Sequence, residues 1–246
     1  MRTLIIYGKT DKGMVRKDNQ DAFFISDLPD NAALAVVCDG MGGANAGNIA
    51  SKMAVGHISN FILNSYRSSM TSDSIIKTLK SALISANIEL YNAALSDFNL
   101  KGMGTTAVAV IYKDSSAFIC NIGDSRAYKV NSEITQITRD HSVVQSLVES
   151  GELTAEEARN HPNKNMITRA LGTEKNVMPD CYEISMKEDD KLLICTDGLT
   201  DFLNNSSILI QFSGEIENVP DKLIAAANSA GGGDNITAVV LLKERK

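Results

Sequence analysis

The middle of the chain contains four β-rich runs that follow one another closely. They are TTAVAVIY, AFICNIG, RAYKV and EITQIT, within residues 105–138. The gaps between them are KDSS, DS and NS, whereas a crossover between parallel strands needs about a dozen residues or more. We therefore expect antiparallel hairpins here, and we exclude a sheet built from repeated β-α-β units.

Patterns on either side of this region complete the prediction of fold class. Upstream, we expect three strands and then two helices with apolar residues at helical spacing, over residues 3–10, 22–26, 33–38, 46–62 and 74–94. Downstream, we expect helical material, a strand pair, another helix and a last strand, over residues 141–171, 180–186, 191–196, 219–229 and 236–242. Antiparallel sheets faced by helices form an α+β layered domain.

Composition sets limits on the class of protein. The 246 residues are 43% hydrophobic and 22% charged, which favours one globular domain over residues 1–246. The net charge is -6 without any basic block, so we expect no nucleic-acid partner. We also expect no signal peptide and no membrane span. The cysteines form no C-x-x-C pair, so we expect four reduced core residues and a cytoplasmic location: Cys38, Cys120, Cys181 and Cys195.

Four aspartates lie beside apolar, strand-like runs and next to or near glycine. Asp39 lies in LAVVCDGMGG, Asp124 in FICNIGDSR, Asp197 in LLICTDGLTD and Asp234 in GGGDNITAVV. One such aspartate would most simply be a turn residue. Four of them indicate a cluster, because strands of a shared sheet can bring their ends together.

A carboxylate cluster at the edge of a core is unfavourable unless cations are present. Like charges repel one another, and burial removes their hydration. The candidate ligands are all oxygen, which suits Mg²⁺ or Mn²⁺ and argues against zinc or copper. Glycine lets the backbone approach a ligand closely, so the carbonyl of Gly40 is a further candidate ligand.

The stretch GMVRKDNQDAFF adds a cation and another carboxylate. The planar guanidinium of Arg16 matches phosphate oxygens, and Asp21 opens a predicted strand. Taken alone, this stretch would favour an ordinary surface role for Arg16.

Seven motifs together resemble one family. They are R-x-x-N-Q-D, D-G-M-G-G, G-T-T-A, G-D-S-R, D-H-S, T-D-G-L-T-D and G-G-D-N-I-T. Their order is that of the metal-dependent protein phosphatases, the type 2C serine/threonine phosphatases, and the chain is most similar to compact bacterial members. The resemblance runs from about Gly8 to Leu242. It implies a four-layer αββα sandwich of two antiparallel sheets flanked by helices.

The resemblance assigns a role to each aspartate. Asp39 matches the carboxylate that bridges two tightly bound ions, and Gly40 matches a carbonyl ligand of the second ion. Asp197 and Asp234 match the remaining ligands of the first ion. Asp124, together with Asp197, matches the pair that holds a weaker third ion.

The remaining assignments concern phosphate and protons. Arg16 matches the phosphate-binding arginine, and Asp21 looks like the carboxylate that holds water beside the metals. Several relatives have a histidine acid where this chain has Met41, so the proton donor to the leaving group is unassigned. We expect the three histidines to be structural: His57, His141 and His161.

The resemblance implies metal-dependent hydrolysis of phosphoserine and phosphothreonine in proteins. Two Mn²⁺ or Mg²⁺ ions would activate a bridging water or hydroxide, without a covalent intermediate. The implied partners are phosphorylated proteins and a serine/threonine kinase that the enzyme opposes, and we expect a monomer. The segment over about 142–172 resembles the family's flap, and its polar residues could either meet substrate or face solvent: Arg159, Asn163, Lys164, Asn165 and Arg169.

Two other functions are compatible with parts of this pattern. One is hydrolysis of small phosphate esters, and the other is binding of phosphoproteins without catalysis. A silent binding module could lose its metal ligands, yet all four aspartates are present. No second aspartate follows Asp39 two residues on, as an aspartyl-phosphate enzyme would need.

Overall fold

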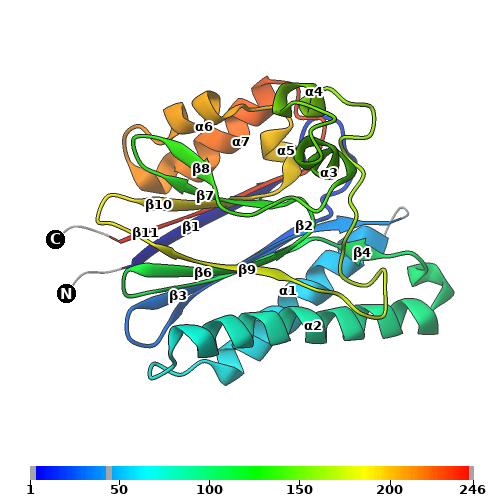
Figure 1. Ribbon diagram of the computed structural model, residues 1–246, viewed down its shortest axis with the longest axis horizontal. Coiled ribbons are helices and arrows are strands. Elements are labelled where there is room, and N and C mark those ends of the chain that lie inside the picture. Colours follow the sequence, from blue (N-terminus) through cyan, green and yellow to red (C-terminus); the bar gives the residue numbers. More distant parts are fainter. Residues whose placement is uncertain (1–3, 43–45, 244–246) are drawn as a thin grey trace.

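The computed structural model describes residues 4–42 and 46–243. Two antiparallel sheets stack face to face, and helices cover the outer side of each (Figure 1). The predicted four-layer αββα sandwich is confirmed. Helices α3 and α4 lie outside these layers, at the end of the sandwich that also holds β4 (Figure 1).

The two sheets are built from segments that are far apart in sequence. The first has the order β1-β11-β10-β7-β8, with bounds Leu4–Asp11, Ile236–Lys243, Lys191–Cys195, Arg126–Val130 and Ile134–Gln136. The second has the order β2-β3-β5-β6-β9, with bounds Asp21–Leu28, Ala32–Met41, Ala107–Lys113, Ser116–Ile122 and Asp180–Ser185. The short strand β4 (Gly104–Thr105) pairs with the end of β3.

The helices divide between the two outer faces. The long helices α1 (Ala46–Ser65) and α2 (Ser72–Ser96) cover the second sheet, and the shorter α5, α6 and α7 cover the first, over Asp197–Thr200, Asn205–Gln211 and Val219–Ser229. Two 3₁₀ turns complete the set, η1 (Phe98–Leu100) and η2 (Ile216–Asn218). One apolar core lies between the sheets, and one lies under each helical layer.

Two of the predicted strand pairs are wrong. Strands β6 and β7 belong to different sheets, as do β9 and β10, although short links join them. Gly123 makes the first of these crossings with φ at +97°, and a Cβ there would lie 2.6 Å from the side chain of Thr106. The chain therefore crosses from one sheet to the other within this short gap, and the crossing places Asp124 at the edge of both sheets.

The segment over residues 142–172 is less helical than the sequence predicted. It contains only α3 (Val143–Glu149) and α4 (Ala155–Arg159), and neither helix has a fully buried residue. Gly151 takes φ +79° just after α3, and turns follow α4. The predicted capping box of Thr154 and Glu157 is confirmed at the start of α4.

The prediction of four reduced cysteines is wrong for two of them. Cys120 and Cys181 form a disulfide, while Cys38 and Cys195 are free and buried. The β6–β9 register places Cys120 directly opposite Cys181. The sequence did not indicate this pairing, since 61 positions separate the two residues. Within the described ranges, no helix is long and apolar enough to cross a bilayer.

Candidate active site

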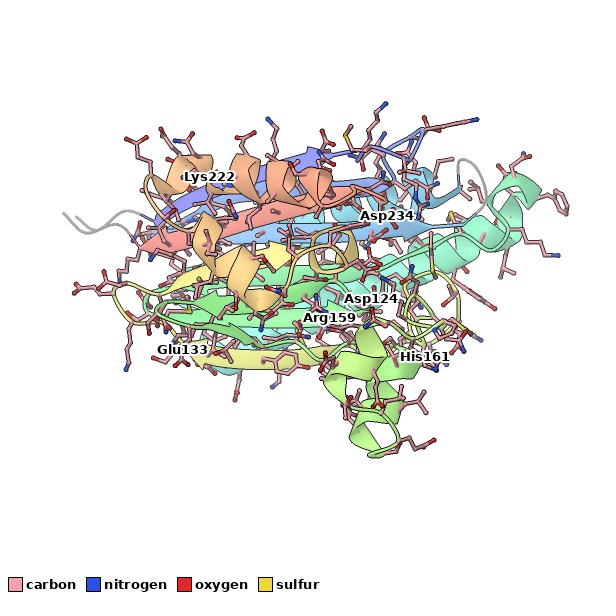
Figure 2. The ribbon with its side chains drawn as sticks, turned by 90° about the horizontal axis from the view of Figure 1, so that it is seen from above. Asp124, Glu133, Arg159, His161, Lys222 and Asp234 are labelled. Atoms are coloured by element: carbon pink, nitrogen blue, oxygen red, sulfur yellow. A yellow bond between two sulfur atoms is a disulfide. The ribbon has the colours of Figure 1, made fainter. Side chains whose placement is uncertain are left out.

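The structure gathers the predicted aspartates at one end of the sandwich. Figure 2 shows Asp124 and Asp234 on the same side of the molecule as the α3–α4 segment, far from Glu133. A pocket of about 240 Å³ brings together all four aspartates, the backbone of Gly40 and the side chain of Arg16: its acidic lining residues are Asp39, Asp124, Asp197 and Asp234.

The end of β3 is fixed by two threonines beside it. The backbone N–H of Asp39 donates to Oγ1 of Thr106 at 2.9 Å. The carbonyl of Asp39 accepts from Oγ1 of Thr105 and from the backbone N–H of Thr106, both at 2.8 Å. These contacts hold the backbone, so they leave the Asp39 carboxyl group free for the pocket.

Two glycines beside the aspartates allow close contact between backbones. A Cβ on Gly40 would lie 2.0 Å from the carbonyl oxygen of Gly47, in the first turn of α1. A Cβ on Gly198 would lie 1.9 Å from the carbonyl oxygen of Asn235. Real Cβ atoms do not approach backbone this closely, so glycine is required at both places to draw the segments of the site together.

Asn235 ties down the loop that carries Arg16. Its Oδ1 accepts from the backbone N–H of Gln20 at 2.8 Å, and its Nδ2 donates to the carbonyls of Lys12 and Asp18 at 2.9 Å each. All three contacts join residues more than 200 positions apart. Asn235 therefore holds the loop that carries Arg16 in place.

The buried carboxyl groups hold protons unusually tightly. Burial raises the pKa of Asp21 to about 7 and that of Asp197 to about 6, and the neighbouring carboxylates add to both shifts. Burial and nearby aspartates raise the pKa of Asp39 and of Asp124 well above the usual range.

This cluster fits a divalent cation. Oδ1 of Asp21 and Oδ1 of Asp197 are buried and have no hydrogen-bond partner in the described part of the chain. Buried oxygens without a partner are costly, and an Mg²⁺ or Mn²⁺ ion coordinates such oxygens while removing their mutual repulsion. Within residues 4–42 and 46–243, no three acidic, histidine or cysteine side chains already converge around one point. Binding of an ion requires these carboxyl groups to lose their protons.

The raised pKa values predict how stability depends on pH without metal. The folded protein binds protons to these groups more tightly than the unfolded chain does, so this stabilisation is present at low pH. It is lost as the pH rises through about 6 to 7, the folded pKa values of Asp197 and Asp21. We expect the melting temperature in EDTA to fall by roughly 5 °C between pH 5 and pH 8. Added Mn²⁺ should remove most of this fall, whereas an equal fall in its presence would contradict the assignment.

Arg16 lies at the rim of the pocket and is half-exposed. Its Nη2 lies 2.7 Å from Oδ2 of Asp234, and its Nε donates to the carbonyl of Gly233 at 3.4 Å. The guanidinium is therefore within reach of the carboxylate cluster, and its positive charge is paired with the carboxylate of Asp234, one member of that cluster.

The histidines do not reach the pocket. No histidine is among the described residues that line it, while Met41 does line it beside Gly40. His57 contacts Ser85 and Glu89 between α1 and α2. His161 accepts a bond from the backbone N–H of Asn163 within a turn. The expectation that they are structural agrees with these positions.

His141 supports the crossing that carries Asp124. Its ring Nδ1 accepts from the backbone N–H of Gly123 at 3.1 Å, and the backbone N–H of His141 donates to the Gly123 carbonyl at 2.9 Å. Its Nε2 lies 3.0 Å from Oδ2 of Asp180. Burial lowers the pKa of His141, so its neutral form is favoured.

A second pocket of about 280 Å³ lies under α3 and α4 and shares Asp124 and Asp197 with the first. Arg159 donates to the carbonyls of Thr200 and Leu203 across this pocket, and Lys164 pairs with Asp201 at 2.7 Å. The polar residues of the segment therefore do not act alike: Arg159 and Lys164 line the second pocket, Asn165 lines the first, and Arg169 contacts Asp180.

Sequence patterns missed two buried contacts that support the site. Arg126 forms bonds of 2.6–3.0 Å with the buried carboxylate of Asp140 in the wall of the second pocket. Thr196 and Thr237 both contact the carboxyl group of Asp21. The G-D-S-R and D-H-S motifs contain or adjoin the first pair, but no pattern showed that the two would meet.

Comparison with known proteins agrees with this geometry. The family model described as protein phosphatase 2C matches residues 14–228. The serine/threonine phosphatase stp of Listeria monocytogenes is 39% identical over 240 residues, covering 96% of this chain and 94% of that protein. The catalytic domain of PstP has been solved with two manganese ions, and it matches with a TM-score of 0.87 at 30% identity over the full length of both chains.

A second solved structure is similar over almost its whole length. Stp1 from Staphylococcus aureus matches with a TM-score of 0.93 and 37% identity, covering 99% of this chain and 96% of that one. The sheets, the helical layers and the chain length all correspond. The chain therefore belongs to the protein phosphatase 2C family and is a serine/threonine phosphatase.

Proposed function

We propose that this pocket hydrolyses phosphoserine and phosphothreonine in proteins by direct attack of water, with two divalent cations bound and no covalent intermediate. The observation that carries the proposal is the gathering of four carboxyl groups, the backbone of Gly40 and the guanidinium of Arg16 in one pocket. When bound, the two ions neutralise charge and lower the pKa of water so that it can attack phosphorus.

The residues that would hold the ions follow from the family resemblance and the pocket. Asp39 would bridge both ions, Gly40 would offer its carbonyl, and Asp197 and Asp234 would complete the set. Asp124 and Asp197 would hold a weaker third ion. Manganese in the PstP structure supports Mn²⁺, and the oxygen donors of this chain suit Mg²⁺ as well.

Arg16 would hold the phosphoryl group in line for attack. In the structure its guanidinium pairs with Asp234. A cation on Asp234 would neutralise that carboxylate and free the guanidinium for phosphate oxygens, which it can contact in a bidentate manner.

Replacing Arg16 with alanine tests this role. Hydrogen bonds to charged groups are worth about 1.5–3 kcal/mol, so we expect kcat/KM for a phosphopeptide to fall about tenfold or more. Mn²⁺ affinity, measured by calorimetry, should not weaken, because Arg16 is no ligand. Arg67→Ala is the matched control, since the guanidinium of Arg67 donates to the backbone carbonyls of Asn64 and Tyr66 at the end of α1. Unchanged kinetics in Arg16→Ala would return Arg16 to the role of a surface residue.

Asp124 would assist protonation of the leaving group, the oxygen of serine or threonine. Met41 cannot donate a proton, and no histidine of the described chain lines the pocket. We propose that Asp124 orders the site water that protonates the serine or threonine oxygen as the P–O bond breaks.

Asp124→Ala should separate this role from binding of the two tight ions. We expect both ions to remain, while hydrolysis of a phosphopeptide falls much more than hydrolysis of p-nitrophenyl phosphate. The reason is that nitrophenolate leaves without needing a proton. Loss of both tight ions, or equal loss on the two substrates, would refute this division of roles.

Substrate class separates the leading proposal from hydrolysis of small esters. Phosphothreonine and phosphoserine peptides, p-nitrophenyl phosphate and sugar phosphates should be compared at equal concentration with Mn²⁺ present. The proposal predicts the highest kcat/KM for phosphopeptides among the natural esters. A sugar phosphate that exceeds every phosphopeptide would instead support a small-ester phosphatase.

Several properties remain proposals about the protein in the cell. We propose that it acts as one catalytic domain and a monomer, on phosphoproteins made by a serine/threonine kinase. A cytoplasmic location also stays a prediction. One of its original supports, four reduced cysteines, does not hold for Cys120 and Cys181.

A further inference from the structure

The carboxyl group of Asp21 is held from one side by two threonines, one in β11 and one directly after β10. Its Oδ2 accepts from Oγ1 of Thr237 at 2.7 Å and from Oγ1 of Thr196 at 2.9 Å. Asp21 is 4% exposed, and the two threonines are fully buried. Oδ1 of Asp21 is buried and has no partner in the described chain. Two donors thus occupy one oxygen, and the other is left without a partner in the described chain.

The bonds around Thr237 have a fixed direction. Oδ1 of Asn19 accepts from the backbone N–H of Asp21 at 3.1 Å, so the amide nitrogen of Asn19 faces Thr10 and donates to its Oγ1 at 2.9 Å. Oγ1 of Thr10 lies 2.8 Å from Oγ1 of Thr237. Each hydroxyl has a single proton, so Thr10 donates to Thr237, and Thr237 donates to Asp21. The chain of donors ends on one carboxylate oxygen.

Thr196 donates to the same oxygen of Asp21, although its position in the chain would allow it to cap a helix instead. It is the N-cap residue of α5, yet its side chain makes no capping bond. Threonine at this position usually bonds to the backbone N–H groups of the first turn. Here Oγ1 donates to Asp21 and accepts from the backbone N–H of Thr237 at 3.0 Å. Both threonines are therefore directed to Asp21.

We propose that Thr237 is a positioning residue for the phosphatase reaction, acting through Asp21. Its hydroxyl, with that of Thr196, keeps Oδ2 occupied and prevents the carboxyl group from turning. Oδ1 is then held ready to accept a hydrogen bond from water among the ligands of the site. Groups that orient the surroundings of a metal in this way commonly change metal affinity or activity about 10- to 100-fold when they are replaced. The inference rests on the proposed metal-dependent hydrolysis at the same pocket.

Thr237→Val removes the hydroxyl and keeps the shape of the side chain, whereas Thr237→Ser keeps the hydroxyl. In the full chain we expect Thr237→Val to lower kcat for a phosphothreonine peptide about tenfold or more, with little change in KM. Calorimetry should show weaker Mn²⁺ binding in this variant, which is a readout independent of turnover. Thr237→Ser should stay near wild type in both measurements.

The matched control is Thr138→Val. Thr138 is also buried, and its Oγ1 accepts from the backbone N–H of Ala127, away from Asp21. It should keep wild-type kcat and Mn²⁺ affinity. If Thr237→Val does not fold, Thr196→Val removes the other donor to the same oxygen, and the same pattern is expected.

A double-mutant cycle tests whether Thr237 acts through Asp21. Thr237→Val should cause no further loss in an Asp21→Asn background, because the group that it orients is already changed. Full additivity would overturn the inference. So would wild-type behaviour of Thr237→Val, or a Thr237→Ser variant as impaired as Thr237→Val. An active wild type with an unaffected Thr237→Val variant refutes only this inference, whereas a wild type without metal-dependent turnover refutes the proposed function as well.

Discussion

Replacing Asp39 with asparagine should lower kcat for a phosphopeptide about a thousandfold or more. Metal ions stabilise the charge of the transition state by several kcal/mol, and each 1.36 kcal/mol corresponds to about a factor of ten in rate. Asp39 is the carboxylate that we assign to both tight ions, so its loss should weaken binding at both. Calorimetry with Mn²⁺ measures this second effect separately from turnover.

The same substitution should stabilise the metal-free protein. Burial and the neighbouring aspartates raise the pKa of Asp39, so a neutral amide removes a repulsive group from the cluster. We expect a higher melting temperature in EDTA together with the lost activity, as is common where function requires an unfavourable arrangement.

Asp190→Asn is the matched control for Asp39→Asn. Asp190 is a buried aspartate, 3% exposed. Its carboxylate pairs with Lys129 and Asn131, far from the pocket. Its replacement should reduce stability and leave kcat unchanged. If Asp39→Asn kept more than about a tenth of the wild-type kcat, the bridging assignment would be wrong.

Removing divalent cations should abolish turnover and lower stability. We expect no measurable hydrolysis of phosphopeptide or p-nitrophenyl phosphate in EDTA, because we assign the activation of the attacking water to the two ions. A ligand present at about 100 times its dissociation constant stabilises the folded state by about 2.7 kcal/mol. For a chain of this size, such binding raises the melting temperature by roughly 5–10 °C.

The control for this experiment is EDTA that is already saturated with Mn²⁺. It should have no effect on activity or melting temperature, and free Mn²⁺ or Mg²⁺ should restore both in the depleted protein. Turnover that persists in protein shown to lack metal by elemental analysis would contradict the assignment.

Local patterns predicted the individual elements well. Helices α1, α2 and α7 have apolar faces with helical spacing, and they begin and end close to the predicted residues. The sequence did not show which strands would pair. A link of two or three residues can close a hairpin within a sheet, as between β5 and β6, or cross to the other sheet, as between β6 and β7. The choice depends on packing between distant segments.

The same limit applies to the active site. The aspartates and Arg16 were predicted because each stands in its own recognisable motif, and the structure brings them to one pocket. The supporting contacts were missed because their partners lie far apart: 216 positions separate Asp21 from Thr237. Motifs therefore predict the groups that carry chemistry, while the tertiary structure is needed to find the groups that orient them.

The most direct test of the central claim is a Mn²⁺ titration of the metal-depleted protein, with phosphate release from a phosphothreonine peptide as the readout. We predict no activity before the first addition and little activity at one equivalent, because both proposed tight sites must fill. Activity should rise steeply as the second equivalent binds. Full activity in the depleted protein, or a plateau at one equivalent, would contradict the two-ion site that we propose for Asp39, Gly40, Asp197 and Asp234.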